Sequence, residues 1–224
     1  MGKSKNRVSD YTADIRKQLN KYGNVQNLLC YFNEKNLTYE HKHMSARKAT
    51  GVDEVTKKQY DSNLVENITK LVKSLKYKTY RPQPVKRAYI PKLNGDKRPL
   101  GIPSYQDKIV QALMANILNV IYEPMFLDCS FGFRPNLTCH SALREIHHIV
   151  TNYNVNYIVE TDIKDFFGSV NHNNLINMLK SIIKDRNLIY YINKFLKAGV
   201  MIDGKRVKTK YGTPQRWFNI SNIS

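Results

Sequence analysis

The sequence predicts an α+β fold, because segments with helical spacing of apolar residues are mixed with two extended segments that turn at glycine. Apolar residues recur three and four positions apart in residues 64–75 and again in residues 109–121, as in helices that bury one face. The pairs Asn94-Gly95 and Asp203-Gly204 each interrupt extended sequence, which is typical of hairpins. With 224 residues, 42% of them hydrophobic, the chain can bury a substantial core.

The first 75 residues are predicted to form short helices that end in an extended hairpin. Asp61-Ser62 is expected to cap a helix whose apolar face is formed by Leu64, Ile68, Leu71, Val72 and Leu75. Arg81-Pro82-Gln83-Pro84 ends that helix, because proline disfavours helical backbone in the residue before it. The hairpin is then expected to pair residues 85–91 with residues 97–102.

The middle of the chain is predicted to hold two helices and a short strand. Ser104 begins the first helix with a Ser-x-x-Asp pattern that resembles a capping box, and Pro124 follows its end. Thr138 is expected to begin the second helix. Residues 157–161 are predicted to form a strand that leads to Asp162. The apolar positions of the two helices are Ile109, Val110, Leu113, Met114, Ile117, Leu118 and Ile121, then Ala142, Leu143, Ile146 and Val150.

The last part of the chain is predicted to contain two helices and a second hairpin. The helices lie near residues 173–184 and 187–198, and Gly199 marks the end of the second. Residues 200–207 turn at Asp203-Gly204. The sequence contains no internal repeat and no low-complexity linker.

Composition predicts a soluble, folded protein with a polyanionic partner. Lys and Arg number 36 against 18 Asp and Glu, a formal charge of +18. No apolar run approaches the roughly 20 residues of a membrane span. Cys30, Cys129 and Cys139 are odd in number and lack metal-ligand spacing, which predicts reduced thiols and a cytoplasmic location. The oligomeric state stays open.

The positive charge is concentrated in the first hundred residues, which hold 22 Lys and Arg against 9 Asp and Glu. Basic residues can simply solvate helix faces. Here, however, tyrosines are interleaved with the cations, and aromatic rings stack on bases while cations neutralise phosphates. The segment therefore predicts nucleic-acid binding without choosing between DNA and RNA. Its residues are Lys76, Tyr77, Lys78, Tyr80, Arg81, Lys86, Arg87, Tyr89 and Lys92.

Asp162 is the candidate catalytic residue. It follows the predicted strand and precedes Lys164-Asp165-Phe166-Phe167. A carboxylate at the end of a rigid strand suits Mg²⁺, which neutralises charge during nucleotidyl transfer. Taken alone, an aspartate in this position is more often a helix cap.

Ordered sequence blocks resemble the fingers and palm of group II intron reverse transcriptases, from about residue 45 to residue 215. The resemblance implies the fingers and an incomplete palm of a right-hand polymerase. Its domains are a helical extension (1–75), fingers (76–155), a partial palm (156–215) and a tail outside the family pattern (216–224). The blocks include Arg81–Arg87, Tyr89–Lys92, Lys97–Pro103, Asp107–Gln111, Tyr122–Phe126, Ser130–Pro135, His140–Leu143, Leu196–Gly199 and Gly212–Gln215, and a similar triplet at Gly51–Asp53.

The resemblance also implies roles for individual residues. Asp162 resembles the first metal-binding aspartate of a two-Mg²⁺ site, which is incomplete here. Phe167 resembles the steric gate against a ribose 2′-OH, and Gln215 resembles a glutamine near the nucleotide and template. Lys92 and Arg98 resemble the groups that hold the dNTP triphosphate, and two cations on adjacent strands can converge on one phosphate chain. A solvated hairpin edge is the alternative for these two cations.

Other motifs are weaker. His147-His148 and Cys139-His140 lack zinc spacing, so a helix surface is the better interpretation. Gly132 and Arg134 are expected to shape a turn near the site, although Arg134 could equally make a structural ion pair. Asp165 and Gly168 depart from the family pattern, which more often has a small residue at the first position and Asp at the second.

The 224 residues contain no Tyr-x-Asp-Asp run, which the family uses to complete its two-metal site. We therefore expect the chain alone not to polymerise. A DNA sequence that encodes residues 216–224 can read Gly-Gly-Leu-Ile-Ser-Pro-Ile-Leu one base later, which resembles the family after Gln215. We hypothesise a one-nucleotide insertion after the Gln215 codon. A deliberately chosen chain end is the alternative.

Two functions remain in competition. The first is an RNA-directed DNA polymerase and maturase that binds intron RNA and template–primer, assists splicing and uses Mg²⁺ and dNTPs. The second is a fragment that binds RNA without catalysis. A generic basic protein of ribosomal type does not explain Asp162, Phe167 and Gly212–Gln215 together. If the palm strand lacks partners, residues 156–215 should be less protected from hydrogen exchange than residues 90–150.

Overall fold

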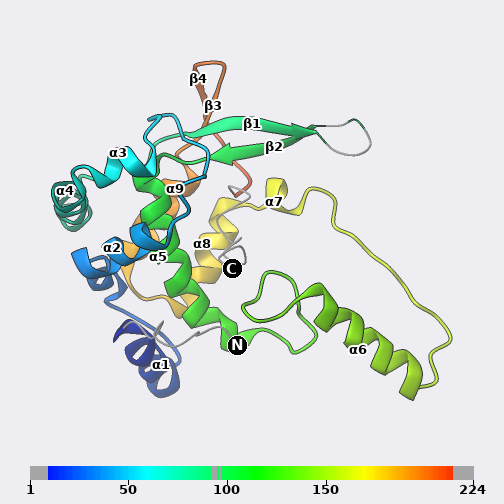
Figure 1. The fold of residues 1–224 in the computed structure, drawn as a ribbon. Helices are drawn as coiled ribbons and strands as arrows, with labels where there is room; N and C mark the ends of the chain where they lie inside the picture. Colours follow the sequence, from blue (N-terminus) through cyan, green and yellow to red (C-terminus); the bar gives the residue numbers. More distant parts are fainter. Residues whose placement is uncertain (1–9, 92–94, 96, 214–224) are drawn as a thin grey trace.

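A long central helix organises the fold. In the computed structural model, which describes residues 10–91, 95 and 97–213, α5 (Tyr105–Tyr122) runs through the middle of the molecule (Figure 1). Ten of its side chains are buried, and helices α1 and α2 pack against it. Ser104 caps it as predicted, because its hydroxyl accepts the N–H of Asp107 at 3.3 Å. The short 3-10 helix η2 (Glu123–Met125) follows directly.

The N-terminal part consists of short helices, as predicted. One cap prediction was wrong: Asn63 precedes α4 without a capping side-chain bond. Asp61 instead ends α3, and its carboxylate accepts a hydrogen bond from the imidazole Nε2 of buried His41 at 2.8 Å. That imidazole meets the hydroxyl of Tyr105 through Nδ1, which ties α2 to α3 and α5. The helices are α1 (Asp10–Tyr22), η1 (Leu28–Tyr31), α2 (Glu34–His43), α3 (Lys57–Asp61) and α4 (Leu64–Lys76).

Both predicted hairpins form, and they join into one four-stranded sheet of order β2-β1-β3-β4. Strand β1 (Val85–Pro91) pairs antiparallel with β2 (Lys97–Ile102), and β3 (Val200–Ile202) pairs likewise with β4 (Lys205–Val207). The two hairpins meet where Val85 lies parallel to Val200, and the N–H of Val85 donates to the carbonyl of Gly199 at 3.0 Å. Helices and a mixed sheet confirm the α+β class.

The C-terminal helices α8 (His172–Ile182) and α9 (Arg186–Leu196) pack into the same core as the N-terminal helices. Asp185 caps α9 through the N–H groups of Asn187 and Leu188, and its other oxygen accepts the N–H of Leu29 at 2.8 Å. Residues 172–200 are therefore well supported, contrary to the weak C-terminal third that the sequence predicts.

The predicted strand at residues 157–161 is wrong for this structure: these residues follow helix α6 (Cys139–Asn152) as extended chain without a ladder. Val159 is 84% exposed, because no strand lies beside this segment and β1 takes β2 and β3 as its partners. Figure 1 shows α6 and the chain after it projecting away from the core. Thr138 caps α6 as predicted, but no side chain of this helix is buried. Among the described residues, no helix combines the length and hydropathy of a membrane span.

Candidate functional site

A short turn of helix presents the aromatic residue singled out in the sequence. Helix α7 (Phe166–Ser169) begins after Asp165, which adopts left-handed backbone at φ 48°. The carbonyl of Asp165 accepts the N–H groups of Gly168 and Ser169, both at 3.0 Å. This turn places Phe167 half-buried beside Phe166, with their rings edge to face at 5.4 Å between centroids.

A loop far away in the sequence supports Phe167. The ring of Phe133 meets the ring of Phe167 edge to face, at 6.2 Å between centroids and 78° between planes. Arg134 fixes this loop: its Nε donates to Glu123 at 3.0 Å, and its Nη1 donates to the carbonyls of Leu127 and Ser130. Arg134 thus both shapes the turn and makes an ion pair, so the two roles considered from the sequence coexist.

The Gly212-Thr213 segment closes the third side of the site. The N–H of Thr213 donates to the carbonyl of Phe167 at 2.9 Å, and the N–H of Gly212 donates to the carbonyl of Val170 at 2.9 Å. The carbonyl of Gly212 also lies 2.7 Å from the imidazole Nε2 of His172, which is buried. The structure therefore brings together three segments that lie near residues 133, 167 and 212. Gln215 lies outside the described residues.

Asp162 lies close to this site along the chain, but it is exposed and belongs to no helix or strand. In the part of the chain that the structure describes, no three His, Cys, Asp or Glu side chains gather as they would around a metal ion. Mg²⁺ is held by carboxylate oxygens, water and substrate phosphates. Asp162 can supply one such oxygen, but the described residues do not form a metal site by themselves.

The hairpin cations are only partly described. Lys92 lies outside the described residues. Arg98 pairs with Ile90 in the β1–β2 ladder, and only its backbone is described. The role of these two residues in holding a triphosphate therefore stays a prediction.

The predicted basic surface forms around the end of α4 and on β1. Lys76, Lys78, Arg81 and Lys86 are exposed and Arg87 is half-buried. Lys86 approaches Glu54 at 3.7 Å. Tyr77 and Tyr89 are also exposed, at 70% and 56%, and can stack on bases.

Tyr80 is the exception to this prediction, because its ring is 6% exposed and its hydroxyl donates to the carboxylate of Asp107 inside the core. Asp107 also accepts the N–H of Gln83 at 3.0 Å. Burial raises the pKa of Asp107 to about 6, while the bonds from Tyr80, Ser104 and Gln83 oppose the rise. Desolvation together with the Asp107 charge raises the pKa of Tyr80 well above its ordinary value. Tyr80 and Asp107 are structural residues and not part of a nucleic-acid surface.

A second set of cations was not predicted from the sequence. Lys194 and Lys197 on and after α9, and Arg206 on β4, lie with Arg81 around one groove beside Tyr190. Tyr190, Lys194 and Lys197 are spaced by four and three residues, which places them on one helix face. That spacing is the signal that could have found them.

Comparisons with known proteins show the family of the chain. Residues 90–218 match the family model "Reverse transcriptase (RNA-dependent DNA polymerase)". The chain is 46% identical over 151 residues to "Group II intron-encoded protein LtrA" of Lactococcus lactis subsp. cremoris, covering 67% of this chain and 25% of that protein. It is 42% identical over 156 residues to "Uncharacterized 91 kDa protein in cob intron" of Schizosaccharomyces pombe, covering 69% and 19%.

A plant protein matches more distantly. "Nuclear intron maturase 1, mitochondrial" of Arabidopsis thaliana is 29% identical over 110 residues, which is 49% of this chain and 15% of that protein. The chain thus spans a quarter or less of the length of these three relatives.

Proposed function

Because the chain belongs to the reverse transcriptase family, in its group II intron-encoded branch, we propose that it supplies the fingers and the first part of the palm to an RNA-directed DNA polymerase that acts on intron RNA. In this proposal residues 76–155 belong to the fingers and residues 156–215 to the palm. Template–primer, dNTPs and the intron RNA are its proposed partners.

The observation that carries the proposal is the meeting of Phe133, Phe167 and the Gly212-Thr213 segment. The ring of Phe167 contacts the ring of Phe133, and its backbone carbonyl accepts the Thr213 N–H, so the residue has little freedom to move. Such a ring can exclude a ribose 2′-OH by contact alone. Gln215 follows Thr213 by two residues and is proposed to meet the same nucleotide.

The charged residues take complementary proposed roles. Lys92 and Arg98 would neutralise the triphosphate, because Lys92 follows β1 directly in the sequence and Arg98 lies on the neighbouring strand β2. Reverse transcriptases use divalent metal ions, which neutralise charge at the attacking and leaving oxygens. Among the residues that the structure describes, Asp162 is the one whose carboxylate we propose helps to hold such an ion.

RNA binding without catalysis is the second proposal. It is favoured by the exposed cations around α4 and α9, which need neither Asp162 nor Phe167 to contact phosphates. In this proposal the chain retains affinity for RNA when nucleotide incorporation is absent.

A chimera tests the first proposal. Residues of this chain would replace the matching 151 residues of the Lactococcus lactis relative, and primer extension on an RNA template would be measured. We expect DNA synthesis by the chimera, loss of synthesis with Asp162→Asn, and increased ribonucleotide incorporation with Phe167→Ala. The matched control is Phe166→Ala, which removes the neighbouring ring. Synthesis that is unaffected by Asp162→Asn would contradict the catalytic assignment.

A further inference from the structure

A groove of about 250 Å³ lies where α9, the segment after α4 and β4 meet. This volume is below the roughly 300–1,000 Å³ of pockets that enclose a whole small molecule. The groove therefore suits a single charged group of a larger ligand. Its lining residues are Arg81, Pro82, Tyr190, Asn193, Lys194, Lys197, Ala198 and Arg206.

Backbone carbonyls hold three of the four cations of this groove in position. Arg81 donates through Nη1 to the carbonyls of Lys78 and Tyr80, at 2.7 and 3.2 Å. Lys194 Nζ lies 3.4 Å from the same Tyr80 carbonyl, and Arg206 donates through Nε to the carbonyl of Ala198 at 3.1 Å. Each guanidinium keeps N–H groups that these bonds do not use. Arg81, Lys194 and Arg206 are thus oriented before a ligand arrives, which lowers the entropic cost of binding.

Positive charge in this groove is not balanced by acidic side chains. Among the residues that the structure describes, no carboxylate lines the groove, and none forms an ion pair with Arg81, Lys194, Lys197 or Arg206. The α9 C-terminus favours Lys194 and Lys197 through its dipole, but that effect does not account for Arg81 and Arg206, which come from other segments. A bound anion would relieve the repulsion among these cations.

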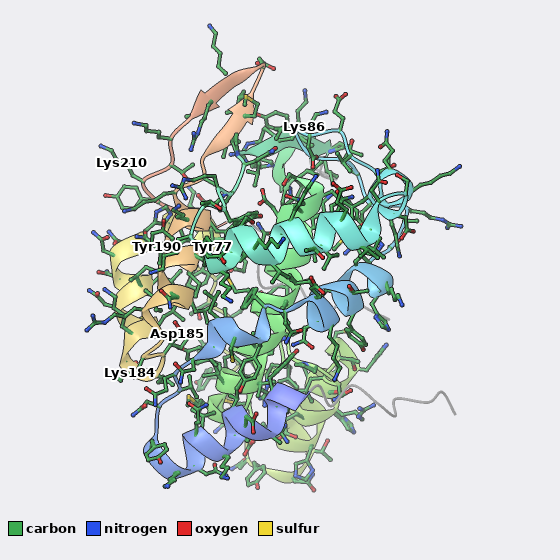
Figure 2. All side chains as sticks on the ribbon, turned by 90° about the vertical axis from the view of Figure 1, so that its left-hand side faces the viewer. Tyr77, Lys86, Lys184, Asp185, Tyr190 and Lys210 are labelled. Carbon is green, nitrogen blue, oxygen red and sulfur yellow. The ribbon has the colours of Figure 1, made fainter. Side chains whose placement is uncertain are left out.

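Aromatic rings border the same cations. Lys194 Nζ lies 4.5 Å from the centroid of the Tyr190 ring. A hydrogen bond from Lys194 lowers the pKa of Tyr190, and the charges of Lys194, Arg81 and Lys78 act in the same direction. Figure 2 shows Tyr77 and Tyr190 on the face that is the left-hand side of Figure 1, whereas α7 lies near the middle of Figure 1. The groove is lined by none of the residues that form the Phe167 site.

We propose that this groove binds the phosphodiester backbone of RNA at a contact separate from the Phe167 site, with Tyr190 and Tyr77 available to stack on neighbouring bases. The RNA held here is not the template–primer but another part of the bound RNA. The choice of RNA rests on the proposed function, whereas the anion site itself rests on the groove.

The test uses the 224-residue chain and a fluorescein-labelled single-stranded RNA of about 16 nucleotides, the upper end of common single-strand site sizes. Fluorescence anisotropy would give the dissociation constant over a series of salt concentrations. The groove variant is Lys194→Gln with Lys197→Gln. The matched control is Arg16→Gln with Lys17→Gln, which removes the same charge from exposed positions on α1.

We expect the groove variant to weaken RNA binding about tenfold and to reduce the slope of log K against log salt by about 1.4, the value for two phosphate contacts on a single strand. The control should change affinity less than the groove variant does. Lys194→Arg with Lys197→Arg should retain binding, which separates loss of charge from loss of folding. Equal loss in the α1 control would overturn the proposal, because it would show diffuse attraction. Groove-dependent binding of polyglutamate as tight as that of RNA would also overturn it.

This test is independent of the polymerase assignment. Asp162→Asn should leave the RNA affinity of the chain unchanged, and the groove variant should leave primer extension by the chimera unchanged at saturating template–primer. Groove-dependent RNA binding with no incorporation in the chimera would refute the polymerase assignment alone. Incorporation without groove-dependent binding would refute the groove alone.

Discussion

The backbone N–H of Thr213 donates to the carbonyl oxygen of Phe167 at 2.9 Å, across 46 residues of sequence. Together with the bond from Gly212 to Val170, it attaches the end of the described chain to the α7 turn. The position of Phe167 therefore depends on the backbone at residues 212–213 as well as on its own turn.

Gly212→Ala should loosen the Phe167 site. Gly212 has φ +86°, and an added Cβ would lie 3.1–3.3 Å from backbone atoms of Phe167 and Gly168, so alanine meets both backbone strain and contact. Hydrogen exchange of the Gly212 and Thr213 amides should speed up roughly tenfold or more, because left-handed backbone alone costs alanine about 1–2 kcal/mol. Gly204→Ala is the matched control, since φ is +74° there and nothing lies within 4 Å. If it affects these two amides as much as Gly212→Ala does, the contact explanation is wrong.

Asp165 and Gly168 should depend on one another. A Cβ at position 168 would clash with the carboxylate of Asp165 as that side chain now lies. Alanine is ordinarily favoured over glycine in a helix by about 1 kcal/mol, but here the carboxylate opposes it. The exposed carboxylate must turn aside to admit the methyl group, so Gly168→Ala should strengthen protection of the amides of residues 168 and 169 less in the native sequence than in the Asp165→Ala background. Equal effects in the two backgrounds would show that the positions are independent.

Stability should fall as pH rises through the titration of Asp107. Its pKa is raised from 3.8 to about 6, so the folded state binds the proton more tightly than the unfolded state does. The free energy of unfolding should decrease between about pH 4 and pH 6 and level off above, by about 3 kcal/mol for a shift of this size. Asp107→Asn should remove this decrease in urea unfolding from pH 4 to pH 8. Parallel pH profiles for the two proteins would contradict the assignment.

Asp185→Ala should destabilise the whole chain. It removes an acceptor for the N–H groups of Leu29, Asn187 and Leu188 at a position that is only 6% exposed. We expect a loss of about 2–4 kcal/mol in the free energy of unfolding, more than the roughly 1 kcal/mol of an ordinary helix cap. Asn171→Ala, which removes the half-buried cap of α8, supplies that comparison. An equal loss in both variants would show that the bond to Leu29 contributes nothing.

Local patterns predicted most of the elements. Helix α5, helix α6 and both hairpins follow from apolar spacing, caps and glycine turns, all of which act over a few residues. The parallel pairing of Val85 with Val200 could not be predicted in this way, because nothing in either segment specifies so distant a partner. The predicted strand at residues 157–161 failed for the same reason: its apolar sequence suits a strand, but pairing requires neighbours.

The aromatic and glycine segments of the candidate site were predicted from the sequence, whereas the basic surface was predicted only in part. Phe167 and Gly212-Thr213 were identified by resemblance, and the structure brings them together. Tyr80 was misassigned because its sequence neighbours are basic, whereas its partner Asp107 lies 27 residues away. Lys194 and Arg206 were missed because charge was assessed along the chain, while the groove collects cations from three separate segments.

The bond between Leu29 and Asp185 sets an order of events during synthesis. The two residues are 156 positions apart, so at roughly 5–20 residues per second the ribosome needs about 8–30 seconds to deliver the second after the first. Until Asp185 has been made, the N–H of Leu29 and the core surface that α9 helps to cover lack these partners. The packing of the N-terminal helices is therefore completed only after residue 185 has been synthesised.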